Sequence, residues 1–197
     1  TLITEPAFSV KFVSDYIPQT VASATIENGY PTIKWDFDST KAADNVYIYR
    51  KAPDSKNVYR LVGVVPATQT TFVDESAKPN YVYDYQLRVE NDGFVTYGGP
   101  VVQVNYMGAP EVKLANDKGR VHIEWNEISR AEKYIVYKKL PTDENWTKLT
   151  TTEKLYFDDK NEVKYVGYQY MVRATDTNGN KSPDGVSEIW KYVPSVA

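Results

Sequence analysis

Apolar and polar residues alternate along most of this chain, which is the period-two pattern of strands that are buried on one face. The clearest case runs from Tyr168 to Thr175, and a polar Asn-Gly turn follows it. A second strand-like run then extends from Val186 to Trp190. This pair predicts the last hairpin of a β-sandwich. No segment has a sustained helical period, so we expect almost no helix.

The same series of runs occurs twice along the chain, which indicates an internal repeat. Each copy has an alternating run that ends in a tryptophan, Ile33 to Asp36 in the first copy and Ile123 to Asn126 in the second. Four further pairs of runs match in the same order: 46–51 with 134–139, 58–62 with 145–149, Thr71–Asp74 with Leu155–Asp158, and 83–89 with 168–174. Each copy supplies about seven short runs separated by turn residues, as antiparallel sandwiches do.

The repeat divides the 197 residues into two domains of common size. Met107-Gly108-Ala109-Pro110 separates the copies, since the proline favours extended backbone before it. We expect one domain over 19–107 and a second over 108–197. Residues 1–18 contain an alternating Phe8, Val10 and Phe12 and are either an added edge strand or the tail of a preceding module. The chain opens at Thr1, from which we expect a processed chain or an excised segment of a longer protein.

Both copies resemble fibronectin type III domains over roughly 175 residues. The second copy carries the resemblance in A-P-E-V-K-L, V-H-I-E-W, A-E-K-Y-I-V-Y-K-K, W-T-K-L, Y-F-D-D and Y-Q-Y-M-V-R-A-T-D-T-N-G-N-K-S-P. These motifs are similar to repeats of secreted, multimodular proteins of Gram-positive anaerobic bacteria. The resemblance implies an all-β fold of two tandem immunoglobulin-like antiparallel sandwiches, and it says little about function because the fold serves many roles.

Four residues are candidates for structural roles. The tryptophans Trp35 and Trp125 have the bulk to fill the centre of each sandwich. The resemblance maps the family's tyrosine corner onto Tyr83 and Tyr168, whose hydroxyls would bond to nearby backbone. Pro79 fits the family pattern ahead of Tyr83, whereas Lys164 takes the matching place in the second copy.

The charge and composition restrict the class of partner. A net charge of −3 and 42% hydrophobic residues indicate a packed protein without the basic field that binding to nucleic acid or anionic membrane requires. No apolar run reaches the ~20 residues of a membrane-spanning helix. There is no cysteine, so a thiolate metal site is not possible, and we expect no metal and no cofactor.

The sequence contains few residues that could act in catalysis. His122 is the only histidine, and strand alternation points it outward beside Glu124, so we expect a solvated strand residue. Asp176-x-Asn178-x-Asn180 resembles the start of a calcium loop but lacks the glycine and the bidentate glutamate, so a polar turn explains it better. Asp36-x-Asp38 and Asp158-Asp159 end strands, where we expect solvated charges. We expect no catalytic residue and no enzyme activity.

An aromatic face is the remaining candidate site. If Val46 and Ile48 face inward, Tyr47 and Tyr49 face outward beside Arg88 of the neighbouring strand. Such a platform could stack on a sugar, a peptide or another domain, or it could simply stabilise an exposed sheet face. In the second copy Tyr137, Met171 and Arg173 occupy the corresponding positions.

Together these features predict a non-catalytic, extracellular or cell-surface module that acts as a spacer or structural interaction module of a larger secreted bacterial protein. Its partners would be neighbouring domains or other proteins. The alternatives are an adhesion module that binds carbohydrate or protein through the Tyr/Arg face, and a structural protein of a phage particle or surface filament. The charge disfavours nucleic acid as a partner, and the hydropathy pattern leads us to expect no insertion into a membrane.

Overall fold

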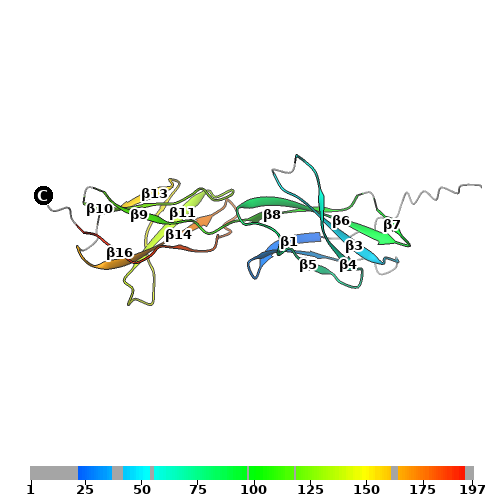
Figure 1. The fold of residues 1–197 in the computed structure, drawn as a ribbon, viewed down its shortest axis with the longest axis horizontal. Coiled ribbons are helices and arrows are strands. Elements are labelled where there is room, and N and C mark those ends of the chain that lie inside the picture. Colours follow the sequence, from blue (N-terminus) through cyan, green and yellow to red (C-terminus); the bar gives the residue numbers. More distant parts are fainter. Residues whose placement is uncertain are drawn as a thin grey trace, which may run out of the picture. The chain divides into compact units, whose positions relative to one another are not determined.

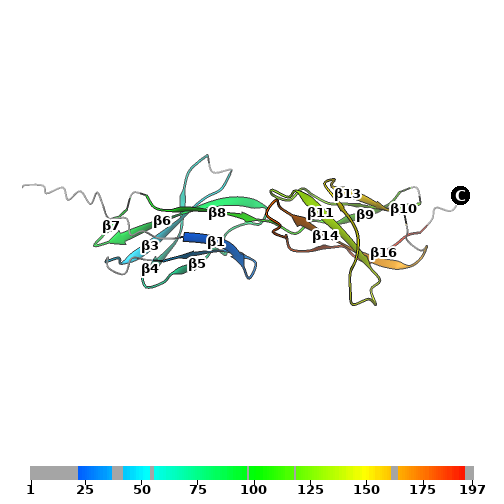
Figure 2. The same cartoon turned by 180° about the vertical axis from the view of Figure 1, so that it is seen from behind.

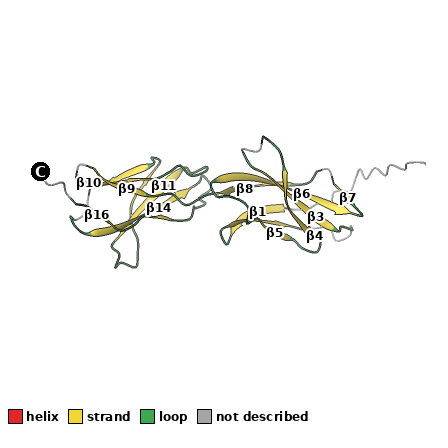
Figure 3. Cartoon of the chain, viewed as in Figure 1, coloured by secondary structure: helices red, strands yellow, loops and turns green. Residues whose placement is uncertain are grey.

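The structure, a computed structural model, describes residues 22–36, 42–53, 56–96, 98–117, 119–160 and 164–193. The described residues form strands and turns without any helix (Figure 3). The predicted strand within residues 1–18 lies outside the described residues. The first sandwich contains β1 (Ala22–Glu27), β2 (Tyr30–Trp35), β3 (Asn45–Lys51), β4 (Arg60–Pro66), β5 (Thr71–Val73), β6 (Tyr81–Asn91), β7 (Phe94–Val95) and β8 (Val101–Tyr106).

The second sandwich repeats the same order of strands. Figure 1 shows the fold of the chain. It contains β9 (Lys113–Asp117), β10 (Arg120–Glu124), β11 (Lys133–Lys139), β12 (Thr147–Thr152), β13 (Tyr156–Asp159), β14 (Gly167–Thr175), β15 (Gly185–Val186) and β16 (Trp190–Lys191). The chain divides into two compact units, and residues 77–83 and 104–107 group with the second. The domain boundary expected at 107/108 stays a prediction.

Each sandwich consists of one three-stranded and one five-stranded antiparallel sheet. In the first, β1-β2-β5 form one sheet and β4-β3-β6-β7 the other, with β8 also paired to β6. In the second, β9-β10-β13 form one sheet and β12-β11-β14-β15 the other, with β16 also paired to β14. Figure 2 shows the same strands from behind. The chain is therefore a tandem of immunoglobulin-like β-sandwiches, as the repeat predicted.

Turn chemistry sets the register at two hairpins of the first sandwich. Asn28 and Gly29 both have positive φ, and so do Asp92 and Gly93. Two left-handed central residues are what a two-residue hairpin turn requires, because its twist then matches that of the strands. The first turn aligns Glu27 with Tyr30, and the second aligns Asn91 with Phe94.

The core of each sandwich comes from the inward positions of both sheets. In the first, Ile33 of β2 and Ile48 of β3 are fully buried, and Trp35 is 4% exposed. The second has the corresponding core, whose buried members are Met107, Val121, Ile123, Trp125, Ile128, Tyr134, Val136, Tyr170, Val172 and Ala174. A β-bulge lies at the same place in both copies, after Ile48 in β3 and after Val136 in β11. The repeat therefore extends to an irregularity of the strands.

The last strand differs from its prediction. The expected run from Val186 to Trp190 is divided into β15 and β16 by residues 187–189. The Ser187 amide donates to the carbonyl of Tyr170 at 2.9 Å, while its Oγ accepts from the Tyr170 amide at 3.0 Å. Ser182 makes the same pair of bonds with Ala174. Serine side chains thus replace ladder carbonyls on either side of β15, which interrupts the regular strand.

Candidate functional site

The predicted Tyr/Arg face is present on the outward side of β3 and β6. Tyr47 lies opposite Arg88 and Tyr49 opposite Gln86 in the β3–β6 register. The Arg88 guanidinium carbon lies 4.4 Å from the centroid of the Tyr49 ring. Its Nε and one terminal nitrogen donate to Gln86 Oε1 at 3.1 and 3.0 Å. These contacts therefore hold Arg88 over the Tyr49 ring.

Two exposed apolar residues of β4 extend this face, and the sequence reasoning did not include them. Val64 lies opposite Tyr47, and Leu61 lies opposite Tyr49. Their side chains are 46% and 49% exposed. We call Tyr47, Tyr49, Leu61, Val64 and Arg88 the β4-β3-β6 face. The signal that could have found them is the edge sequence R-L-V-G-V-V-P, in which apolar residues occupy outward positions.

The corresponding face of the second sandwich has different chemistry. Tyr137 lies opposite Met171, and Arg173 is 5.9 Å from the Tyr137 ring. Arg173 Nε donates to Asp184 Oδ1 at 2.5 Å, and a terminal nitrogen of Arg173 donates to Asp184 Oδ2 at 2.8 Å. These hydrogen bonds raise the pKa of Arg173. Met171 is 3% exposed, so the expectation that it lies on an open platform is wrong.

Each sandwich also contains a buried aspartate that joins strands of its two sheets. Asp74 is 1% exposed and accepts from the Tyr85 hydroxyl at 2.8 Å and from Arg50 at 2.7 Å. The backbone amide and the hydroxyl of Ser76 also donate to this carboxylate, at 3.1 and 2.6 Å. Burial, and then the charge of Asp74, raises the pKa of Tyr85 well above its usual range.

The second sandwich repeats this cluster with a lysine in place of the arginine. Asp159 is 2% exposed and accepts from Lys138 Nζ at 2.5 Å and from the Tyr170 hydroxyl at 2.9 Å. Lys138 Nζ also lies 4.0 Å from the centroid of the Tyr168 ring. The expectation that Asp159 is a solvated strand end is therefore wrong.

This cluster also corrects the alignment of the two copies. Ile33 pairs with Phe72, and its counterpart Ile123 pairs with Phe157. Asp74 therefore corresponds to Asp159, one residue later than the match to Asp158 that the sequence suggested. A one-residue shift sends a strand side chain to the opposite face, so Asp158 faces outward and Asp159 faces the core.

His122 lies on the outward face of β10, as predicted, but it has a partner. Its Nδ1 is 2.7 Å from Asp158 Oδ1, and its ring centroid is 5.6 Å from that of Tyr156. Arg120 contacts the other oxygen of Asp158 at 3.5 Å. The described residues place no serine or threonine hydroxyl in a hydrogen bond to this imidazole. The arrangement is a surface network that joins strands β10 and β13.

The Asp176 loop is a polar turn, as the sequence favoured. Asp176 Oδ1 accepts from the amides of Asn178 and Asn180 at 3.0 and 2.9 Å, and Oδ2 accepts from the Asn180 side chain at 2.9 Å. Gly179 has the positive φ that this turn requires. Both carboxylate oxygens of Asp176 thus accept hydrogen bonds within the loop. Over the described ranges, no group of three or more histidines, cysteines and carboxylates is arranged to hold a metal ion.

The structure describes the surroundings of the candidate structural residues Tyr83, Trp35 and Trp125. The Tyr83 hydroxyl donates to the Lys78 carbonyl at 3.0 Å and accepts from the Lys78 amide at 3.1 Å, which is a tyrosine corner. The residue five positions before Tyr168 is Val163, which lies outside the described residues. Trp35 and Trp125 are 4% and 5% exposed.

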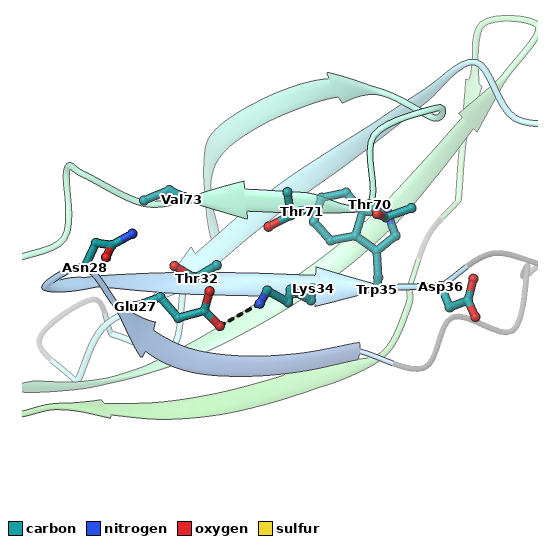
Figure 4. A pocket seen from close by; sticks show the side chains of 9 residues that line it. All are labelled: Glu27, Asn28, Thr32, Lys34, Trp35, Asp36, Thr70, Thr71 and Val73. Atoms are coloured by element: carbon teal, nitrogen blue, oxygen red, sulfur yellow. Dashed lines mark hydrogen bonds and ion pairs between the residues drawn. The ribbon is translucent and has the colours of Figure 1, made fainter.

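A hollow of about 700 Å³ is lined by residues of β1, β2 and β5 and of the segments next to them (Figure 4). Its lining residues are Glu27, Asn28, Thr32, Lys34, Trp35, Asp36, Thr70, Thr71 and Val73. Glu27 and Lys34 form an ion pair at 2.7 Å across it. This hydrogen bond lowers the pKa of Glu27. Glu27 and Lys34 thus neutralise each other, whereas Asp36 adds a further carboxylate, and threonines supply much of the remaining surface.

Comparison with known proteins gives one relative by sequence and no family. No protein-family model matches the chain. A titin homolog from Caenorhabditis elegans is 27% identical over 158 residues, which cover 69% of this chain and 1% of that protein. The chain therefore spans only a very small part of this relative.

The chain is also similar to two solved structures from chicken. A segment of two fibronectin type III domains from tenascin covers 90% of this chain and 95% of its own, with a TM-score of 0.45 and 15% identity. The interferon gamma receptor alpha chain covers 88% of this chain and 98% of its own, with a TM-score of 0.39 and 12% identity. The fold assignment above rests on strand order and register. Across the described residues, no helix is long and apolar enough to span a membrane.

Proposed function

We propose that this chain is a non-catalytic structural module, of fibronectin type III type, within a longer multidomain protein, where it spaces its neighbours and presents surfaces to them. The buried Asp74 and Asp159 clusters carry this proposal. In each copy, a carboxylate that catalysis could have used is instead bound by a cation and a tyrosine that tie strands together. Buried polar networks of this kind favour one well-defined packing of a sandwich.

The match to the titin homolog supports the modular part of the proposal. A similarity that covers most of this chain but 1% of the relative is the relation expected between one tandem module and a very long protein. The setting that we propose is extracellular, in a secreted or surface protein of a bacterium. The support for that setting is the resemblance of the second-copy motifs to repeats of secreted bacterial proteins.

A second candidate function is direct binding to another protein through the β4-β3-β6 face. The observation that favours it is the fixed Arg88–Tyr49 stack beside the exposed Leu61 and Val64. Tyrosine and arginine are enriched at protein interfaces. The third alternative, a component of a phage particle or filament, requires regular self-association of this chain.

Light scattering on the purified chain separates the spacer from the assembly alternative. A spacer module is expected to remain a monomer of 22.4 kDa over a wide range of concentration. A defined oligomer or filament would contradict the spacer and favour the assembly alternative. Val64→Lys would then test whether the β4 edge mediates the association, since an edge lysine opposes strand pairing.

A further inference from the structure

The outward rows of the two five-stranded sheets have different chemistry at matched positions. In the first sandwich, the edge strand β4 places Val64 beside Tyr47 and Leu61 beside Tyr49. At the corresponding positions of the second, β12 places Thr151 beside Ile135 and Lys148 beside Tyr137. Charged side chains on an edge strand, lysine above all, oppose pairing with a strand of another chain. The first sandwich lacks that protection at both positions.

The arginines of the two faces also differ in their partners. Arg173 is neutralised by the two-pronged bond to Asp184. Arg88 contacts Gln86 and the Tyr49 ring, and the described residues place no carboxylate within ion-pair distance of it. Its Nε–H and one terminal N–H are used by Gln86, so three of the five guanidinium N–H groups have no acceptor in the described part of the chain.

This arrangement leaves the terminal edge of the guanidinium available to a carboxylate. Arginine binds carboxylates through two parallel N–H groups, and such charged hydrogen bonds are shorter and stronger than neutral ones. Because Gln86 and Tyr49 already fix the side chain, little rotamer entropy remains to be lost on binding. The site is therefore preorganised for one acidic group.

We propose that the β4-β3-β6 face docks a partner protein that carries an apolar patch and an acidic residue beside it. The apolar patch would cover Leu61 and Val64, and the carboxylate would bind Arg88. Arg88 lies two strands from β4, so the two parts of the partner are separated by about 10 Å, or twice the strand spacing. A carbohydrate fits less well, since Arg88 already covers one face of the Tyr49 ring on which a sugar would stack.

The proposal is tested with two synthetic peptides that share a Leu-Val pair and differ in one later residue, Glu or Lys. Each is titrated into the full ¹⁵N-labelled chain, and its binding is followed by amide shifts and by the Arg88 Nε–H signal. We expect the Glu peptide to shift signals of β3, β4 and β6 and to bind about tenfold more tightly than the Lys peptide.

Matched variants decide the assignment. Arg88→Gln is expected to abolish the preference for the Glu peptide, and Arg173→Gln to leave it unchanged. Val64→Thr, which installs the residue of the second copy, is expected to weaken both peptides equally. Urea midpoints of all variants confirm that they are folded.

Three results would overturn the proposal: equal binding of the two peptides, a preference that survives Arg88→Gln, or shifts that map to β11 and β12. Stronger shifts of the same signals by an oligo-uronate would overturn the choice of a protein partner. The inference rests on the interaction role of the proposed module, whereas the monomer mass from light scattering reports on the spacer role independently.

Discussion

Asp158 and Asp159 are adjacent carboxylates with opposite environments, and replacing each by asparagine tests the buried cluster sharply. Asp159→Asn removes the charge that Lys138 contacts in a site where the two side chains are 10% and 3% exposed. The ammonium of Lys138 would remain in the interior without a counterion. Breaking a buried ion pair from one side costs about 3–5 kcal/mol.

Asp158→Asn serves as the matched control. The Asp158 side chain is 21% exposed and its partners His122 and Arg120 are 30% exposed, so the ion pairs are partly screened by water. Pairs of this kind contribute about 1 kcal/mol or less. The two variants have the same composition and lie next to each other, so a difference between them isolates burial.

Urea unfolding followed by tryptophan fluorescence measures the effect. Trp125, Trp146 and Trp190 all belong to the second sandwich, so the signal reports mainly on it. With a urea dependence of about 1 kcal/mol per M for a small domain, Asp159→Asn should lower the midpoint by about 3 M or more. Asp158→Asn should lower it by about 1 M or less. Equal shifts would refute the burial and the register on which the reasoning depends.

Three further predictions follow from the first sandwich. Gly63→Ala should destabilise it by about 1–3 kcal/mol in urea unfolding, because the added Cβ would overlap the Phe72 ring, whereas Gly98→Ala meets open space and should change little. Tyr83→Phe should cost about 1–3 kcal/mol by leaving the Lys78 backbone groups unsatisfied, and an unchanged midpoint would argue against the tyrosine corner. Tyr85 has a higher pKa in the folded chain than the value of about 10 for an unfolded tyrosine, so its contribution to stability is complete below about pH 10. Above that pH the contribution falls by about 1.4 kcal/mol per pH unit, because the unfolded chain loses the phenol proton first. Urea midpoints between pH 9 and 11 should therefore fall more steeply for the parent chain than for Tyr85→Phe, and parallel curves would contradict this.

Much of the architecture could be predicted from the sequence because alternation reports directly on burial. Ile33, Trp35, Ile123 and Trp125 are all buried, as their alternating runs required. The placement of Tyr47 beside Arg88 followed from the same parity once the two strands were taken as neighbours. Such inferences use only the period of a strand and the order of strands in the fold.

The buried aspartates could not be predicted in this way. A carboxylate at the end of a strand has the same local sequence whether it meets solvent or a cation from another strand. Asp74 is satisfied by Arg50, 24 residues earlier, and by Tyr85, 11 residues later. The repeat offered a signal, since Arg50 and Lys138 hold matching places, but the one-residue misalignment to Asp158 hid it.

The division of the last strand also could not be predicted from the alternation of apolar and polar residues. The run from Val186 to Trp190 has strand-like composition, and nothing in it shows that the Ser187 hydroxyl takes the place of a ladder carbonyl. Likewise, Met171 occupies an outward position by parity and is nevertheless covered. Both outcomes depend on contacts with other strands that a local pattern does not record.

Single-molecule stretching of the whole chain between two handles tests most directly the claim that it consists of two sandwiches, each stabilised by its own buried cluster. We expect two separate unfolding events, each of which releases about 30 nm of contour length for about 90 residues. Asp159→Asn should lower the force of one event and leave the other unchanged. A single event, or two events that weaken together in this variant, would contradict the account.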